Sequence, residues 1–289
     1  MGICDNRTII VTGAAAGLGR GYALALAAEG ANVLVNDIRA DAAGAVAKEI
    51  GARGLANNDD ITSMSGAQSI VDAAVKKFGD VHGVINNAGV VRDKMFASMS
   101  EDDWDLVIKV HLRGHFCISS TLVRRWRDQV KSGAKVDARI VNTSSGAGLQ
   151  GSVGQSNYAA AKGGIASLTL VQAAELGRYG VTVNALAPAA RTGMTEPVFG
   201  AVMKKPEDGS FDHFAPENVA PLVVWLCSPL SAHVSGKVFE VEGGKVSIAN
   251  GWKTGVMRDK KARWQPAELT DVVNALLTEA PKAQKVYGT

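Results

Sequence analysis

The sequence predicts an α/β fold: a doubly wound parallel sheet with helices on both faces, in a single domain that carries a C-terminal extension. Two observations support this prediction. Short apolar runs alternate along the 289 residues with Ala- and charge-rich segments of helical spacing, and strands that alternate with helices pair in parallel. The composition, with 46% hydrophobic residues and 32 glycines, suits strands that are buried on both faces and joined by tight turns.

The alternation gives each element in order. The apolar runs expected to form strands are Thr8–Val11, Asn32–Val35, Gly54–Asn57, Val81–Ile85, Arg139–Thr143, Val181–Leu186 and Lys237–Val241. The segments with the spacing of helices are Arg20–Glu29, Ala40–Ile50, Ser65–Phe78, Glu101–Leu122 and Asn157–Tyr179. Right-handed crossovers between such strands make the sheet doubly wound and leave a ligand crevice at the carboxyl ends of the strands.

A glycine-rich turn lies between the first strand and the first helix. It reads Thr12-Gly13-Ala14-Ala15-Ala16-Gly17-Leu18-Gly19, and a strand, a glycine turn and a helix in this order predict a dinucleotide site of the Rossmann type. Gly13 permits the tight turn, Gly17 lets the backbone approach the pyrophosphate, and Gly19 allows close packing of helix on strand. The N–H groups of the helix N-terminus then face the phosphates. We expect Gly13, Ala16, Gly17, Leu18 and Gly19 to contact the cofactor.

Asp37 indicates which dinucleotide is bound. It follows the second strand, twenty-four residues after Gly13. A carboxylate at this point can accept both ribose hydroxyls of NAD and repels the additional phosphate of NADP. Arg39, two residues further on, could instead recruit that phosphate. The sequence favours NAD, with NADP as the alternative.

Three side chains in the stretch Thr143–Lys162 predict proton transfer. Tyr158 lies four residues before Lys162 in a helical run, so both side chains emerge on one face. A phenol has a pKa of about 10, and an ammonium group beside it favours the phenolate. Ser145 can hold the oxygen of an alcohol or ketone while Tyr158 moves the proton. We predict Ser145, Tyr158 and Lys162 as catalytic residues; without the glycine-rich turn, Tyr158 and Lys162 would be read as an exposed helical pair.

With these motifs in order, from Asp5 to about Gly244, the chain resembles the short-chain dehydrogenase/reductase superfamily. Further matches resemble the (3R)-hydroxyacyl-CoA dehydrogenase part of peroxisomal multifunctional enzyme type 2 and its free-standing bacterial relatives. The segments that carry this closer resemblance are Arg92–Phe96, Asp102–Asp105, Val110–Gly114, Gln155–Tyr158 and Val219–Cys227.

The resemblance implies further cofactor contacts. The turn Asn86–Gly89 would lie against the adenine ribose through Asn87, Ala88 and Gly89. Either Asp59 or Asp60 would meet the adenine amino group, Asp60 being favoured, with capping of the next helix as the alternative. Thr192 would bond the nicotinamide carboxamide, unless Thr195 does so. Tyr158 and Lys162 would also contact the nicotinamide ribose.

His111 departs from the superfamily pattern. Most members carry asparagine at this point of the motif, where it helps to hold a water beside the catalytic lysine. A neutral imidazole has one donor and one acceptor nitrogen and could support the same proton path. The alternative is a histidine that packs against a helix carbonyl, and the sequence does not decide between the two.

The resemblance also implies the reaction. We expect an NAD-dependent oxidoreductase that oxidises a secondary alcohol to a ketone, with (3R)-3-hydroxyacyl-CoA as the substrate. The alternatives are a 17β-hydroxysteroid dehydrogenase, an NADPH-dependent 3-oxoacyl thioester reductase and a dinucleotide-binding regulator without turnover. The superfamily further implies a homodimer or homotetramer, formed through the helices Glu101–Leu122 and Asn157–Tyr179.

The remaining observations concern organisation and exclusions. Residues 1–244 are expected to form the dinucleotide-binding and catalytic domain, and 245–289 an extension packed on it. The segment Ala187–Pro216, rich in proline and glycine, is expected to form a mobile lid.

The net charge of +3, without a stripe of basic and aromatic residues, gives no reason to expect nucleic-acid binding. No apolar stretch of about 18 residues and no signal peptide is seen, so no membrane contact and a cytoplasmic location are expected. Three distant cysteines predict free thiols and no metal site.

Overall fold

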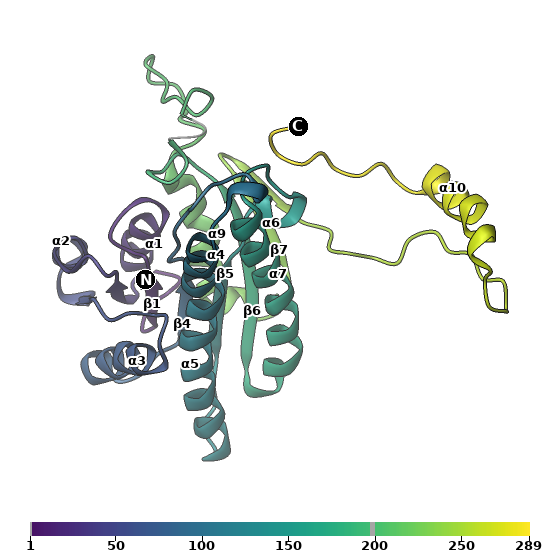
Figure 1. Ribbon diagram of the computed structural model, residues 1–289. Helices are drawn as coiled ribbons and strands as arrows, with labels where there is room; N and C mark the ends of the chain where they lie inside the picture. The colour runs from purple at the N-terminus through teal and green to yellow at the C-terminus, as the bar shows by residue number, and fades with distance from the viewer. Residues whose placement is uncertain (1, 197–199) are drawn as a thin grey trace.

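The computed structural model describes residues 2–196 and 200–289 and contains one eight-stranded sheet covered by helices on both faces (Figure 1). The strand order is β3-β2-β1-β4-β5-β6-β7-β8. The strands are β1 (Thr8–Thr12), β2 (Asn32–Asn36), β3 (Gly54–Asn57), β4 (Gly83–Asn86), β5 (Ala138–Thr143), β6 (Val181–Ala189), β7 (Val238–Glu242) and β8 (Lys245–Ile248). All pairs are parallel except β7–β8. The predicted doubly wound α/β fold is therefore confirmed.

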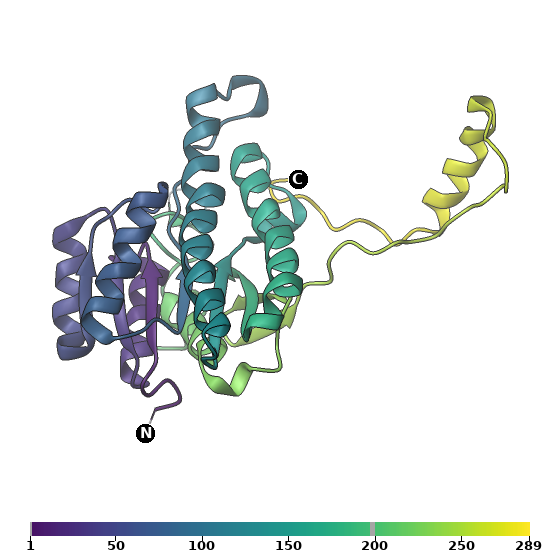
Figure 2. The same cartoon turned by 90° about the horizontal axis from the view of Figure 1, so that it is seen from below.

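The helices cover both faces of the sheet. They are α1 (Gly17–Ala28), α2 (Ala40–Ile50), α3 (Met64–Phe78), α4 (Glu101–Ile108), α5 (Gly114–Lys131), α6 (Gly146–Gln150), α7 (Ser156–Leu176), α9 (Ala220–Cys227) and α10 (Leu269–Glu279). One core joins the sheet to α1, α2 and α9 through residues such as Tyr22, Val46 and Val223. The other joins it to α3 and α5 through Ile70 and Ile118, with α7 on the same side (Figure 2).

The described residues also contain short 3-10 helices. They are η1 (Gly51–Arg53), η2 (Phe96–Ser98), η4 (Gly177–Tyr179), η5 (Pro216–Val219), η6 (Pro229–Ser231) and η7 (Pro266–Glu268). Within the described residues, no helix combines the length and the apolar character needed to cross a membrane. Cys4, Cys117 and Cys227 are free and buried, as expected.

The expected helix Glu101–Leu122 is not one regular α-helix. It is divided into α4 and α5 by a π-helical turn, η3 (Lys109–Arg113). A π turn inserts an additional residue into the helical backbone and is often found at functional sites. Here it contains His111, which is completely buried. The helix α6, which directly follows Ser145, was also not expected from the sequence.

The segment between β6 and η5 leaves the carboxyl edge of the sheet, and its ends are pinned together. Arg191 forms an ion pair with Asp212, and the Arg191 backbone N–H donates to the carbonyl of Phe214 at 2.8 Å. Residues 197–199 of the expected lid lie outside the described residues. That the segment moves remains a prediction.

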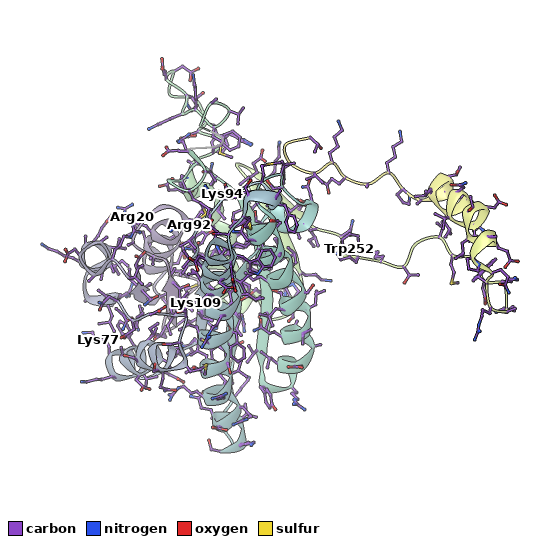
Figure 3. All side chains as sticks on the ribbon, viewed as in Figure 1. Arg20, Lys77, Arg92, Lys94, Lys109 and Trp252 are labelled. Carbon is purple, nitrogen blue, oxygen red and sulfur yellow. The ribbon has the colours of Figure 1, made fainter. Side chains whose placement is uncertain are left out.

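The expectation that the whole extension packs on the domain is wrong for its middle part. Strand β8 pairs with β7, but the chain then leaves the body, and α10 stands apart from the rest of the molecule in both views (Figures 1 and 2). The apolar residues Leu269, Val273 and Leu277 of α10 are 40–70% exposed, and Trp252 is fully exposed (Figure 3). The last residues return to the body beside Gly151.

Candidate active site

A cleft of about 630 Å³ opens at the carboxyl ends of β1, β2, β4, β5 and β6. The predicted residues that line it are Gly13, Ala16, Gly17, Leu18, Asp37, Asp59, Asp60, Asn87, Ala88, Gly89, Ser145, Tyr158, Lys162 and Thr192. Of the predicted set, only Gly19 does not line the cleft. The parallel sheet explains this convergence, because the carboxyl ends of its strands meet at one edge.

The glycine-rich turn forms one wall of the cleft. Gly13 and Gly17 have φ angles of +62° and +52°, a region that side chains disfavour. A Cβ atom at Gly13 would lie 2.7 Å from the Cα of Ala88, so only glycine fits between the turn and its neighbour. A Cβ at Gly19 would lie 2.2 Å from the carbonyl oxygen of Gly13, so Gly19 serves the packing of α1 against the turn.

The turn after β4 holds the glycine-rich turn in place. Asn87 donates through Nδ2 to the carbonyls of Thr12 and Gly13, both at 3.1 Å. The Thr12 hydroxyl accepts from the backbone N–H groups of Asn87 and Ala88 at 3.0 and 3.1 Å. The two turns therefore form one hydrogen-bonded unit. The glycine backbone and the N-terminus of α1 at this unit provide a cradle that fits the pyrophosphate of a dinucleotide.

Asp37 lies at the end of β2, where its carboxylate accepts a hydrogen bond from the Ala15 N–H at 3.2 Å. Arg39 forms a bidentate pair with the same carboxylate, through Nε and Nη2 at 3.1 Å each. Burial raises the pKa of Asp37, but the hydrogen bonds and charge of Arg39 outweigh it and hold the pKa below its usual value. Asp37 is therefore ionised. Its carboxylate pairs with the Arg39 guanidinium, which could otherwise bind the additional phosphate of NADP.

Asp59 and Asp60 both line the cleft beside Asp37. Asp59 accepts from Asn57 Nδ2 at 2.7 Å and from the Ser69 hydroxyl at 2.7 Å. Asp60 accepts from the backbone and hydroxyl of Thr62, both at 2.8 Å. Ser63 caps α3 by accepting from Gly66 N–H, so capping requires neither aspartate. The contact of either one with an adenine remains a prediction.

Ser145, Tyr158 and Lys162 lie together at the other end of the cleft. Ser145 is the N-cap of α6, where its hydroxyl accepts from the Ala147 N–H at 3.2 Å. The same hydroxyl lies close enough to Tyr158 to lower the pKa of the phenol. Lys162 Nζ lies 5.5 Å from the centre of the Tyr158 ring and donates to the Thr143 carbonyl at 2.6 Å. The three predicted catalytic side chains are thus within reach of one small ligand.

The electrostatics of these side chains differ from the expectation. We expected the Lys162 ammonium group to lower the pKa of Tyr158. In the structure, burial dominates: it raises the pKa of Tyr158 to about 12, although the neighbouring Ser145 hydroxyl acts in the opposite direction. Burial also lowers the pKa of Lys162 to about 7. Lys162 is therefore poised to exchange a proton near neutral pH, and ionisation of Tyr158 requires a further positive charge in the cleft.

His111 reaches the same end of the cleft from the π turn. Its Nε2 lies 3.0 Å from the backbone nitrogen and 2.7 Å from the carbonyl oxygen of Val90, and its ring packs edge-on against Tyr158 with the centres 5.2 Å apart. Burial, followed by the charge of Lys162, lowers its pKa to about 3, so the ring is neutral. A Cβ at Gly89 would lie 2.3 Å from Cε1 of His111, which explains the glycine there.

The alternatives for His111 are therefore partly resolved. The ring does contact a backbone carbonyl, but this is the carbonyl of Val90 in the turn after β4 and not the helix carbonyl of the packing interpretation. The His111 Nδ1 atom is buried and has no hydrogen-bond partner among the described residues. A buried polar atom of this kind is costly unless a water or ligand satisfies it. The structure therefore also leaves His111 able to take part in a proton path.

Sequence reasoning missed several residues of the site. The Thr143 carbonyl accepts a hydrogen bond from Lys162, and a backbone contact of this kind cannot be predicted from residue types. The Ile38 side chain lies at the edge of the cleft and is 74% exposed, so the sequence does not distinguish it from an ordinary surface residue. Gln155 donates through Nε2 to Asp93 at 2.9 Å and so supports the loop that precedes Tyr158. Thr192 and Thr195 both line the cleft and hydrogen-bond to each other, so the choice between them stays open.

The family model for short chain dehydrogenases matches residues 7–201. The chain belongs to the short-chain dehydrogenase family. It is 46% identical to the hydroxyacyl-CoA dehydrogenase ChsB1 of Mycobacterium tuberculosis, over 92% of this chain and 87% of that protein. It is 38% identical to peroxisomal multifunctional enzyme type 2 of Mus musculus, over 92% of this chain and 36% of the mouse protein. The resemblance inferred from the motifs is confirmed.

Solved structures agree with the family assignment. A short chain dehydrogenase from Mycobacterium avium is 53% identical, with a TM-score of 0.91 and full coverage of both chains. A 3-ketoacyl-(acyl-carrier-protein) reductase from Brucella melitensis, solved in complex with NADH, is 28% identical with a TM-score of 0.75, over 83% of this chain and 98% of that one. The chain is an oxidoreductase that acts on CH–OH groups with a nicotinamide cofactor.

Proposed function

We propose that this protein is an NAD-dependent dehydrogenase that oxidises a (3R)-3-hydroxyacyl-CoA thioester to the 3-oxoacyl-CoA. The observation that carries the proposal is the cleft itself, with Ser145, Tyr158 and Lys162 at one end and the anionic Asp37 at the other. The similarity to the hydroxyacyl-CoA dehydrogenase ChsB1, at 46% identity over nearly the whole chain, supports this substrate class.

The residues of the cleft divide the chemistry between them. Ser145 holds the C3 hydroxyl of the substrate through its own hydroxyl, which lines the cleft together with Tyr158. Tyr158 takes the hydroxyl proton as a general base. Lys162, with a pKa of about 7, accepts in its neutral form the proton that Tyr158 gives up and passes it on. When bound, the nicotinamide accepts the hydride from C3, so the substrate loses two electrons and one proton is released.

The choice of NAD over NADP rests on Asp37. The low pKa of Asp37 keeps its carboxylate ionised. A carboxylate at this position can accept hydrogen bonds from both ribose hydroxyls of NAD, whereas one of these hydroxyls carries a phosphate in NADP. The similarity to a reductase solved with NADH is consistent with this choice. Arg39 does not compete, because its guanidinium is held by Asp37.

A substrate panel tests the proposal. Both hands of short and long 3-hydroxyacyl-CoA thioesters and free hydroxysteroids are each incubated with NAD and with NADP, and formation of the reduced nicotinamide is followed by absorbance. We expect the highest kcat/KM for a (3R)-thioester with NAD. Faster turnover of free steroids would favour a hydroxysteroid dehydrogenase, and a preference for NADPH and the 3-oxo thioester would favour a reductase. No turnover with any alcohol would leave only a binding protein.

We further propose that the protein assembles as a homodimer or homotetramer through the face formed by α4, α5 and α7. Large apolar side chains lie exposed on these helices: Phe116 on α5 and Leu170 and Val171 on α7 are 51–53% exposed. Small exposed residues such as Ala160 and Ala174 lie on α7 as well, which lets a second helix approach closely. An exposed apolar face of this kind is typical of a protein–protein interface.

A further inference from the structure

The loop Gly151–Gln155 joins the two catalytic helices, because it connects α6, capped by Ser145, to α7, which contains Tyr158. The position of Ser145 relative to Tyr158 therefore depends on this loop. It is held from two sides by backbone segments that are far away in the sequence. One segment is Arg92–Lys94, and the other is the C-terminal segment Val286–Thr289.

The C-terminal segment binds the loop as a short parallel strand. Tyr287 donates its backbone N–H to the carbonyl of Gly151 at 3.1 Å, and its carbonyl accepts from Val153 N–H at 3.0 Å, with Ser152 opposite Tyr287. Gly288, at φ +88°, then turns the chain away, and a Cβ there would lie 3.3 Å from the Cβ of Val153. The contact thus uses the backbone of the loop on both sides of Ser152.

The Tyr287 side chain continues this contact toward the catalytic centre. Its hydroxyl accepts a hydrogen bond from Gln150 Nε2 at 3.0 Å. A Cβ on Gly146, the residue directly after Ser145, would lie 2.5 Å from the same hydroxyl. The phenol therefore rests against the backbone at the start of α6. Glycine at position 146 is what allows this approach.

The opposite side of the loop is fixed in a similar way. Lys94 (Figure 3) donates its backbone N–H to the carbonyl of Gly154 at 2.8 Å, and Gln155 Nε2 donates to Asp93 Oδ2 at 2.9 Å. Directly after Lys94, the side chains of Met95 and Phe96 are 60% and 77% exposed. On the other side, Val153 and Tyr287 are 47% and 42% exposed. The loop next to Ser145 and Tyr158 is therefore bordered by apolar side chains on both sides.

We propose that Tyr287 is a specificity-determining residue of this enzyme: its backbone positions the loop between Ser145 and Tyr158, and its ring forms an apolar wall for the large substituent of the reacting carbon. This inference rests on the proposed function, since a long acyl chain is the substituent that such a wall would receive. A substrate with a small substituent does not extend to the Tyr287 ring. Removal of the ring should therefore lower kcat/KM for substrates with a large substituent more than for substrates with a small one.

The test measures kcat/KM for pairs of secondary alcohols that differ in the size of one substituent, with Tyr287→Ala, Tyr287→Phe and a chain that ends at Lys285. The matched control is Leu277→Ala, which removes an exposed apolar side chain from α10 and leaves the tail contacts in place. We expect Tyr287→Ala, which keeps the backbone pairing, to lose about tenfold or more with the large member of a pair, the size of a lost apolar pocket contact. The small member should change by less than about threefold in this variant. The shortened chain also loses the backbone pairing with the loop and should lose activity with both members, and Leu277→Ala should change neither.

Tyr287→Phe keeps the ring and removes the hydrogen bond to Gln150. We expect it to retain the size preference of the unchanged protein. NAD binding and the melting temperature should stay the same in all variants that keep the fold. Equal losses of Tyr287→Ala for large and small substrates would show a merely structural tail and overturn the inference, as would no loss at all in this variant.

The two proposals can fail separately. The pairs are drawn both from 3-hydroxyacyl-CoA thioesters and from free hydroxysteroids. If only steroids are oxidised, the proposed substrate class is wrong, and the size effect is then measured on the steroid pairs. If thioesters are oxidised without any size effect of Tyr287→Ala, the proposed function stands and the inference about Tyr287 is wrong.

Discussion

Lys162 combines a functional position with an environment that disfavours its charge. Burial lowers its pKa from 10.5 to about 7, although the ammonium group donates to the Thr143 carbonyl. An unfolded lysine titrates near its ordinary pKa, so between pH 7 and 10.5 the unfolded chain binds more protons than the native chain. The contribution of Lys162 to the free energy of unfolding therefore rises with pH across this window, by at most about 1.4 kcal/mol per pH unit.

The substitution Lys162→Met removes this titration. We expect the free energy of unfolding of the unchanged protein to rise between pH 7 and 9.5, and that of the variant to rise less, because methionine carries no proton. Chemical denaturation at several pH values measures both slopes. Parallel slopes for the two proteins would contradict the low pKa of Lys162.

Tyr158→Phe keeps the aromatic ring and removes the hydroxyl that the proposed mechanism uses. We expect the melting temperature and NAD binding to persist while turnover falls by about 10²–10⁴-fold, the usual contribution of a general acid–base group. Tyr179→Phe, at the far end of the same helical segment, is the control and should keep full activity. Near-normal turnover in Tyr158→Phe would refute the assignment.

Asp37→Ala should change the cofactor preference. The substitution removes a carboxylate that repels phosphate and frees Arg39 from its ion pair, so kcat/KM with NADP should rise relative to NAD. Asp41→Ala removes an exposed carboxylate on α2 and serves as the control, with no expected change. Steady-state kinetics with both cofactors decide the matter. If the unchanged protein already prefers NADP, the role given to Asp37 is wrong.

At the scale of elements, the sequence predicts most of the sheet because its central strands, such as β1, β4 and β5, are buried along their whole length and stand out as short apolar runs. β3 and α2 have the predicted boundaries, and the other predicted strands differ by one to three residues at their ends. β8 was missed for a physical reason: it pairs on one side only, and all four of its side chains are exposed, so no apolar run marks it. The π turn was missed because helical spacing alone does not report one inserted residue.

In the candidate site, too, residues in short motifs can be predicted from the sequence, whereas contacts between distant segments cannot. Its glycine-rich turn and its Ser145, Tyr158 and Lys162 set lie in short motifs, and the sequence predicts their convergence because strand ends meet at one edge. Contacts between distant segments leave no such signal. The backbone pairing of Tyr287 with Gly151 joins residues that lie in separate parts of the chain. It depends on the path of the segment between β8 and Tyr287, and no motif in the sequence predicts that path.

The N-terminus of α7 is held to α4 by one buried side chain. Asn157 donates through Nδ2 to the carbonyls of Arg92 at 3.0 Å and Asp103 at 3.1 Å, and it directly precedes Tyr158. Asn157→Ala would leave both carbonyls without this donor, at a cost of about 1–3 kcal/mol. We expect a lower melting temperature and a lower kcat, with NAD affinity retained. Calorimetry and initial rates measure these effects, and an unchanged kcat would show that α7 keeps its position without this link.

At the scale of the whole molecule, the proposed assembly through α4, α5 and α7 is open to a direct measurement. We expect analytical ultracentrifugation at micromolar concentration to give the mass of a dimer or tetramer. Leu170→Arg places a charge on the exposed face of α7 and should reduce that mass. Leu230→Arg, on an equally exposed residue of η6, is the control and should not. A monomer mass for the unchanged protein would refute the proposal.

The side chains at positions 89 and 111 compete for one space. The imidazole of His111 fills the space that a side chain on Gly89 would need, since a Cβ there would lie 2.3 Å from the ring. Gly89→Ala should therefore destabilise the protein more while His111 is present than after residue 111 has been made smaller. The turn after β4 and the π turn are thus energetically coupled through this one contact.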